Sequence, residues 1–122
     1  MPFTLTWKDH GVYKKFTGFV SFQEYARSQE MVLGDPRTDD LRYVINDLLD
    51  VEGYSVTLHE AEYAAAFNRG ASLSNPRLRI AYVTRDIKAI TLLKLVSVLS
   101  SFPIKTFATI EEARAWAALA PT

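Results

Sequence analysis

Polar residues that could support chemistry gather in one stretch of the sequence, residues 43–60. An apolar run at 43–45 is followed by the carboxylates Asp47, Asp50 and Glu52. We interpret these carboxylates as a polar turn at the end of a strand, where open parallel sheets often bind ligands. Their oxygens could hold a divalent cation, but acidic side chains are also usual in solvated turns, and we favour the solvated turn.

Two hydroxyls follow the carboxylates, Ser55 and Thr57. A phosphate on Thr57 would lie at the positive end of a helix dipole, beside unpaired backbone amides. Thr57 also stands three residues before Glu60, the spacing of a capping box in which the threonine side chain accepts from the backbone. We favour the helix cap over a phosphorylation site, and Ser55 is the weaker of the two phosphorylation candidates.

Groups suited to catalysis are sparse in this sequence. There is no cysteine, and the two histidines are His10, in a predicted turn, and His59, in the first turn of a predicted helix. Neither histidine has a second one at a metal-binding spacing. The sequence also lacks a glycine-rich phosphate loop and a recognisable serine nucleophile elbow. We therefore predict no enzyme activity, no catalytic residue, no metal site and no cofactor.

A predicted helix that Asp86 can cap, running to about residue 101, carries more apolar side chains than one face can hold. A helix on one face of a sheet needs only an apolar stripe. The surplus must contact neighbouring helices, a second copy of the chain, a protein partner or an apolar ligand, and we favour a protein partner or homodimer over a lipid. The candidate interaction surface comprises Ile87, Ile90, Leu92, Leu93, Leu95, Val96, Val98 and Leu99.

The segments described above belong to an alternating series of strands and helices. Residues 3–8 and 11–20 predict two strands joined by a turn at residues 9–11, an antiparallel hairpin. Ser21 and Glu24 have the capping-box spacing and open a helix that ends at Gly34. Further strands are predicted at 43–45, 78–84 and 103–107, with helices over 57–68, from 86, and from a third capping box at Thr109; residues 69–76 are predicted as a loop.

The resulting order, ββαβαβαβα, predicts an α/β fold with a mostly parallel five-stranded sheet, an antiparallel N-terminal edge hairpin and four helices. A chain of 122 residues suits a single domain, 1–122. Fourteen basic and fourteen acidic residues cancel, which disfavours nucleic acid, and the pair Lys14-Lys15 is interpreted as a solvated strand face. With no secretory signal, no membrane span and no cysteine, we expect a soluble cytoplasmic protein.

Four segments carry a resemblance to a known family: GVYKKFTGFVSFQEYARSQE, YVINDL, LRIAYVT and the closing KTFATIEEARAWAA. With the order of elements, they make the sequence resemble the SpoIIAA-like proteins, bacterial relatives of the STAS domain that are grouped with lipid-binding CRAL-TRIO domains. The resemblance implies that fold and a regulatory role, since STAS antagonists bind partner kinases and sigma-factor regulators.

Many STAS antagonists are switched by phosphorylation at the start of the helix after the third strand. Their motif contains an aspartate, two hydroxyl residues and a glycine, whereas this sequence has Tyr54-Ser55-Val56-Thr57-Leu58 there. Asp47 resembles the family's strand-terminal aspartate. The resemblance therefore supports the fold more than the phosphorylation switch.

From these observations we predict a non-catalytic regulatory or protein-interaction module in the bacterial cytoplasm. It would dock through the helix at 87–99 and use residues 47–57 as a second contact surface. The alternative is a carrier of a small apolar ligand or lipid, with the same helix lining a pocket. A phosphorylation switch at Thr57 is the third possibility.

Overall fold

The predicted element order is found in the structure, a computed structural model that describes residues 3–100 and 104–119. Its sheet has the spatial order β1-β2-β3-β4-β5, with β1 and β2 antiparallel and the other neighbours parallel. The fold-class prediction is therefore confirmed. The strands are β1 Phe3–Lys8, β2 Gly11–Ser21, β3 Tyr43–Ser55, β4 Arg79–Val83 and β5 Ile104–Phe107, and the helices are α1 Phe22–Leu33, α2 Leu58–Ser74, α3 Ile87–Ser100 and α4 Ile110–Ala117, with a short 3-10 helix η1 at Pro36–Asp40.

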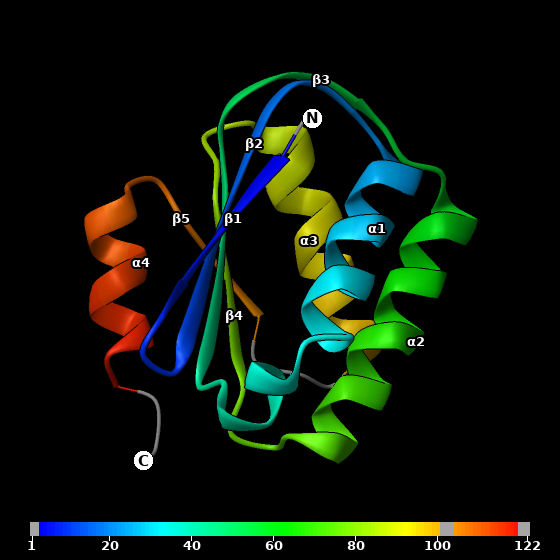
Figure 1. Ribbon diagram of the computed structural model, residues 1–122. Helices are drawn as coiled ribbons and strands as arrows, with labels where there is room; N and C mark the ends of the chain where they lie inside the picture. Colours follow the sequence, from blue (N-terminus) through cyan, green and yellow to red (C-terminus); the bar gives the residue numbers. More distant parts are fainter. Residues whose placement is uncertain (1–2, 101–103, 120–122) are drawn as a thin grey trace.

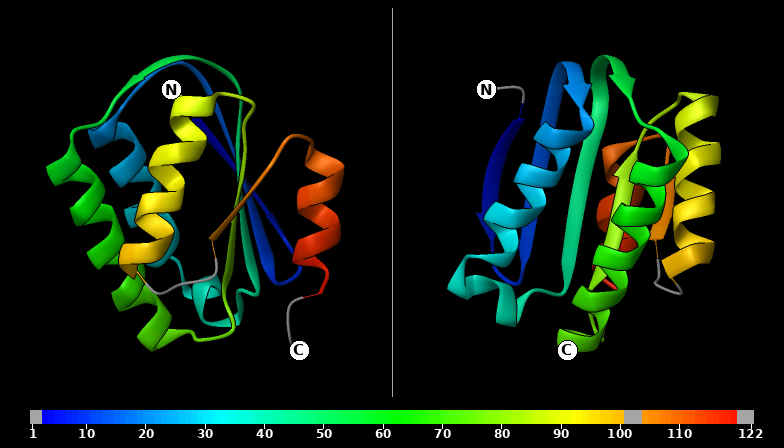
Figure 2. Two further views of the ribbon diagram at one scale, coloured as in Figure 1. Left: turned by 180° about the vertical axis from the view of Figure 1, so that it is seen from behind. Right: turned by 90° about the vertical axis from the view of Figure 1, so that its right-hand side faces the viewer.

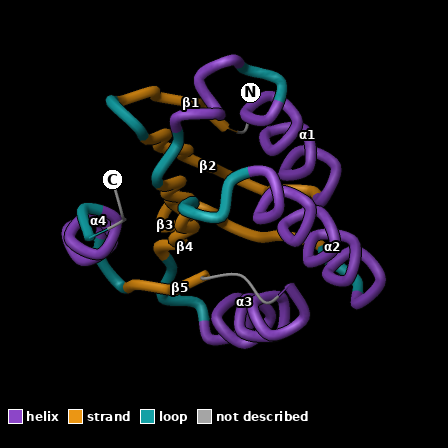
Figure 3. Tube along the Cα trace, turned by 90° about the horizontal axis from the view of Figure 1, so that it is seen from below, coloured by secondary structure: helices purple, strands orange, loops and turns teal. Residues whose placement is uncertain are grey.

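Three helices cover one face of the sheet and α4 covers the other (Figures 1 and 2). Each parallel connection, through α1, α2 and α3 in turn, moves one strand further in the same direction across the sheet. Because such connections are right-handed, successive steps in one direction place their helices on the same face. Only the last helix, which follows the edge strand β5, returns on the opposite face (Figure 3).

The helix starts follow the caps that the sequence predicts. The Ser21 side chain accepts from the Glu24 amide at 3.2 Å, and the Glu24 carboxylate accepts from the Ser21 amide at 3.1 Å. Thr57 and Glu60 form the same reciprocal pair, while Asp86 accepts from the Lys88 amide at 3.1 Å at the start of α3. Before α4, Thr109 accepts from the Glu112 amide, but the Glu112 carboxylate accepts from the Thr109 hydroxyl instead of completing the box.

Strand β3 is much longer than its apolar run, so the predicted polar turn is wrong. Asp47, Asp50 and Glu52 all lie within the strand. The strand continues because β2 pairs with it as far as Ser21 and Ser55, whereas β4 pairs with it only over residues 43–47. Beyond that point β2 and β3 form a ribbon that arches over the helices (Figure 1), and exposed positions such as Asp50 and Glu52 can be polar.

Helix α2 also extends past its predicted end, through most of the expected loop at 69–76. The helix ends at Ser74 and is capped by Asn75, whose backbone amide donates to the Ala71 carbonyl at 2.9 Å. The Asn75 side chain donates to the Leu41 carbonyl at 2.8 Å, which ties this helix end to the segment before β3. Gly70 is a weak helix former, but this long-range anchor and the continuing backbone bonds outweigh its local preference.

The hydrophobic core has a part on each face of the sheet. On the side of α1–α3, Val12, Val44 and Ile80 pack with Ala61 and Ala65 of α2. On the side of α4, Ile45, Ala81 and Val83 pack with Ala113 and Ala117. The described helices include none that is long and apolar enough to cross a membrane.

Candidate functional site

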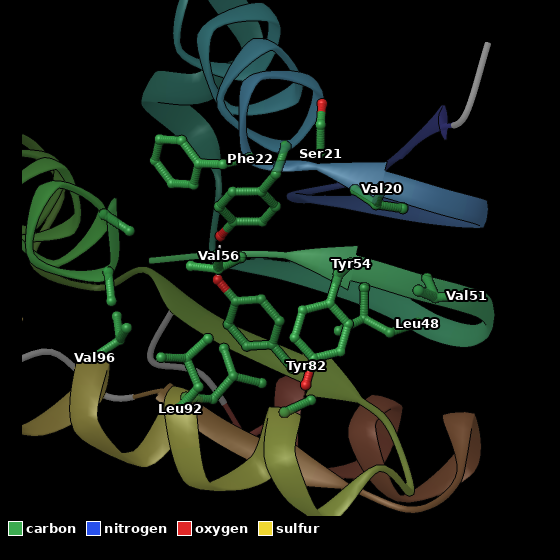
Figure 4. A pocket seen from close by; sticks show the side chains of 15 residues that line it. Val20, Ser21, Phe22, Leu48, Val51, Tyr54, Val56, Tyr82, Leu92 and Val96 are labelled. Atoms are coloured by element: carbon green, nitrogen blue, oxygen red, sulfur yellow. Dashed lines mark hydrogen bonds between the residues drawn. The ribbon is translucent and has the colours of Figure 1, made fainter. Parts of the chain in front are cut away.

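An apolar cavity of about 110 Å³ lies between the sheet and the three helices α1–α3. In Figure 4, Leu48, Tyr54 and Val56 face this space from the side of β3, and Leu92 and Val96 face it from α3. The lining residues come from both faces of the gap: Val20, Ser21, Phe22, Tyr25, Leu48, Val51, Tyr54, Val56, Ala61, Ala64, Tyr82, Ala89, Leu92, Leu93 and Val96.

Small side chains explain why this space stays open. Helix α2 contributes Ala61 and Ala64 to the lining, and α3 contributes Ala89, so three positions carry only a methyl group. Helix α1 meets α2 here through long side chains, such as Phe22, whose ring lies edge-on to Tyr63 with centroids 6.0 Å apart. Side chains that border the cavity have no opposing atoms there and so lack dispersion contacts. A ligand of matching shape would provide these contacts.

Four lining residues carry a hydroxyl, Ser21, Tyr25, Tyr54 and Tyr82, and two of these hydroxyls contact each other. The hydroxyls of Tyr25, on α1, and Tyr82, on β4, form a hydrogen bond with each other. Burial raises the pKa of Tyr25 to about 12 and that of Tyr82 well above its ordinary value. Both phenols are therefore neutral at physiological pH, and each hydroxyl can donate as well as accept a hydrogen bond.

A completely buried lysine lies behind this pair of tyrosines. Lys14 donates to the Ser28 hydroxyl at 3.2 Å and to the Gln29 side-chain carbonyl at 2.7 Å, and its Nζ lies 5.6 Å from the centroid of the Tyr25 ring. No carboxylate of the described residues forms a salt bridge with it. Burial therefore lowers the pKa of Lys14 to about 7.

Gln29 connects this lysine to the cavity wall. Its side-chain amide donates to the Tyr25 hydroxyl at 3.2 Å and lies 3.5 Å from the side-chain oxygen of Asn68 on α2. The Asn68 amide nitrogen is buried without a hydrogen-bond partner among the described residues. The network of Lys14, Gln29, Tyr25 and Tyr82 thus runs from β2 through α1 to β4.

The interpretation of Lys14-Lys15 as a solvated strand face is wrong for the first of the two. Lys14 is buried, whereas Lys15 is partly exposed and forms a salt bridge with Asp50 at 2.8 Å. The alternation in β2 was the signal that could have found it, because Val12, Lys14 and Phe16 share one face of the strand. Two buried apolar neighbours at two-residue spacing place the lysine inside.

The structure divides the predicted interaction surface of α3 between inside and outside. Leu92, Leu93 and Val96 line the cavity. Ile90 and Leu99 are half-buried. Ile87 and Val98 remain 77% and 76% exposed, and Leu95 is 38% exposed. One helix therefore supplies both a cavity wall and an outer apolar stripe.

Two of the three predicted carboxylates, Asp47 and Asp50, lie together on the α4 side of the sheet, where both are near Lys15. Asp47 is buried, accepts a hydrogen bond from the Tyr13 hydroxyl and another from the Leu49 amide at 3.0 Å, and has the Lys15 Nζ 4.0 Å away. Burial, followed by the Asp47 bond, raises the pKa of Tyr13 to about 12. Glu52 takes no part in these contacts, and the described residues contain no cluster of three metal-ligating side chains.

Thr57 and Ser55 are both exposed near the start of α2. The Thr57 side chain accepts from the Glu60 amide at 3.1 Å, so the predicted cap is confirmed, while phosphorylation of either residue stays a prediction. The Glu60 carboxylate accepts from the Thr57 amide at 2.9 Å. A phosphate on Thr57 would repel this carboxylate and would have to displace it.

Comparisons with known proteins place the fold. No protein-family model and no curated protein matches the chain. Among solved structures, the unphosphorylated form of the anti-sigma factor antagonist SpoIIAA is 12% identical, with a TM-score of 0.65 over 96% of this chain and 98% of that one. The phosphorylated form of the Bacillus cell fate determinant SpoIIAA is 14% identical, with a TM-score of 0.61 over 93% and 97%.

A third solved structure is an uncharacterized protein with a SpoIIAA-like fold from Shewanella loihica. It is 14% identical, with a TM-score of 0.56 over 93% of this chain and 90% of that one. The predicted resemblance is thus confirmed at the level of fold: this chain has the SpoIIAA-like fold. Sequence identities this low establish a shared fold but not a shared function.

Proposed function

We propose that this chain is a non-catalytic binding module whose site is the cavity under α1–α3 and whose ligand is a small apolar molecule. The observation that supports it is the near-complete apolar lining, to which both β3 and α3 contribute. Concave, largely apolar spaces with a few placed polar groups are typical of small-molecule sites. A regulatory role of the kind named for SpoIIAA would then depend on whether the cavity is filled.

Filling the cavity with protein atoms tests this proposal. Ala64 lines the cavity, whereas Ala66, on the same helix, is exposed. We expect Ala64→Leu to weaken binding of octanol, measured by calorimetry, by roughly tenfold or more, while Ala66→Leu leaves it unchanged. Equal binding by both variants, or no binding of octanol by the unmodified protein, would contradict the proposal.

A second candidate function is docking to a protein partner or to another copy of the chain through the outer stripe of α3. The exposure of Ile87, Leu95 and Val98 supports it, since apolar side chains gathered along one helix face often mark an interface. We expect Ile87→Lys with Val98→Glu to abolish any concentration-dependent association in sedimentation velocity. Leu73→Glu, at the equally exposed end of α2, is the matched control. A protein that stays monomeric at millimolar concentration would rule out self-association.

A further inference from the structure

The two tyrosine hydroxyls at the cavity wall carry one more proton than their surroundings accept. Tyr25 and Tyr82 share a single hydrogen bond, and Gln29 already donates to the Tyr25 oxygen at 3.2 Å. The two hydroxyls therefore have two protons to donate, but only one of these protons has an acceptor. No other acceptor among the described residues is bonded to either hydroxyl, so one proton is left without an acceptor, beside the cavity that both rings line.

The charge behind these hydroxyls is also uncompensated. Every polar contact of Lys14 is with a neutral oxygen, from Ser28 or Gln29. Its Nζ also lies over the face of the neutral Tyr25 ring, 5.6 Å from the ring centroid. A buried ammonium without an anion is unfavourable, and an anion placed near it would be strongly stabilised in the low-dielectric interior.

The remaining wall of the cavity suits a hydrocarbon chain. The lining includes Leu92, Leu93 and Val96 of α3 and, from the side of β3, Leu48, Val51 and Val56. None of these has a hydrogen-bonding side chain. Tyr82 lies beside Leu92 in Figure 4, so the polar and apolar parts of the wall adjoin. A ligand here would have one polar end and an apolar body.

We propose that the cavity's ligand is an amphipathic carboxylic acid. Its carboxylate accepts from the Tyr25–Tyr82 hydroxyl pair, in the field of the Lys14 ammonium, and its hydrocarbon part lies against α3. The proposal rests on the function proposed above, and it adds a head-group preference that an apolar cavity alone would not have. Lys14 acts as a positioning residue, because it does not line the cavity and is connected to it through Gln29 and Tyr25.

Octanoate and octanol have the same chain length, so a comparison of their affinities isolates the contribution of the head group from that of the hydrocarbon tail. We expect the unmodified protein to bind octanoate more tightly than octanol by roughly tenfold, because only the carboxylate gains from the buried ammonium. Lys14→Met, which fills the same volume without charge, should remove this preference, measured as the ratio of the two affinities. Tyr25→Phe should reduce the preference as well, since it removes a donor.

Proton uptake gives a readout that a merely structural role of Lys14 would not move. Ser28, Gln29 and Tyr25 of α1 contact the amine, and its register neighbours are Leu5 on β1 and Asn46 on β3. Among these described neighbours, Tyr25 is the titratable group. At pH 8, octanoate binding should take up a proton, measured by calorimetry in buffers of different ionisation enthalpy, and Lys14→Met should abolish that uptake.

The two proposals fail separately in this design. Octanol binding with no preference for octanoate overturns the carboxylic acid proposal and leaves the apolar cavity standing. An octanoate preference that persists in Lys14→Met also overturns it, provided that circular dichroism shows the variant to be folded. Binding of neither compound overturns both proposals.

Discussion

At the scale of single residues, the burial of Lys14 has the largest consequences, because it affects both the stability of the fold and the proposed ligand preference. Lys14 is held by neutral oxygens and one aromatic face, and this costs stability whenever the amine is protonated. The same residue is the source of the head-group preference proposed above. The chain would thus give up some stability for function at this position.

The pH dependence of stability tests the cost of burying Lys14. Burial lowers its pKa from 10.5 to about 7. Between these values the unfolded chain binds a proton that the folded chain does not, so the unfolding free energy rises with pH over this range. Lys14→Met should remove that rise and stabilise the protein below pH 7 by about 2–4 kcal/mol in urea titrations. A variant less stable than the unmodified protein at pH 6 would contradict this.

The cap of α2 gives a second prediction at this scale. Thr57→Ala removes the acceptor for the Glu60 amide and should lower the unfolding free energy by about 1 kcal/mol, whereas Thr57→Ser keeps the acceptor and should lose only a few tenths. Thr57→Glu should leave octanol binding unchanged if the residue is only a cap. A large change in binding with Thr57→Glu would instead favour the phosphorylation switch.

At the scale of elements, local patterns predicted where helices begin but not how far elements run. Ser21, Thr57 and Asp86 were identified as caps because each depends on residues two or three positions away. The length of β3 could not be found in this way, since its polar half is held by pairing with β2, more than thirty residues earlier. For Lys14, residue type and strand position point in opposite directions, since lysine favours solvent but the alternation of β2 places this residue inside.

Close packing between β2 and β3 gives a prediction for these paired elements. A methyl group on Gly11 would fall inside the ring of Tyr43, with 1.9 Å to its Cζ. Gly11→Ala should therefore displace that ring and lower the unfolding free energy by about 1–3 kcal/mol. Gly70→Ala, which meets open space within a helix, should instead be neutral or stabilising. The two variants can be compared by thermal denaturation, and equal melting temperatures would contradict the account.

At the scale of the whole molecule, the apolar cavity lies on the side of the sheet that α1–α3 cover, away from α4. The helices α1–α3 surround the empty space, whereas α4 packs its alanines directly on the other face of the sheet. Elements with fewer buried contacts open more readily. The sequence predicted that α3 has more apolar surface than one face needs and offered a pocket beside it as an alternative. It did not predict which side chains border the cavity, because this depends on how α1 and α2 sit.

Hydrogen exchange should reveal this difference. We expect amides of α1 and α2 to exchange faster than those of β3 and β4, and octanoate to slow exchange in α1–α3. Helix α4, on the opposite face, is the internal control and should not respond (Figure 2). Protection confined to α4 would place the ligand elsewhere.

The order of the strands across the sheet is the same as their order along the chain. During synthesis from the N-terminus, each new strand therefore finds its neighbour already made, and no gap has to be kept open for a later segment. Short distances along the chain between pairing partners also favour rapid folding. On the ribosome, the sheet can grow one strand at a time, and only the last helix has to cross to the uncovered face.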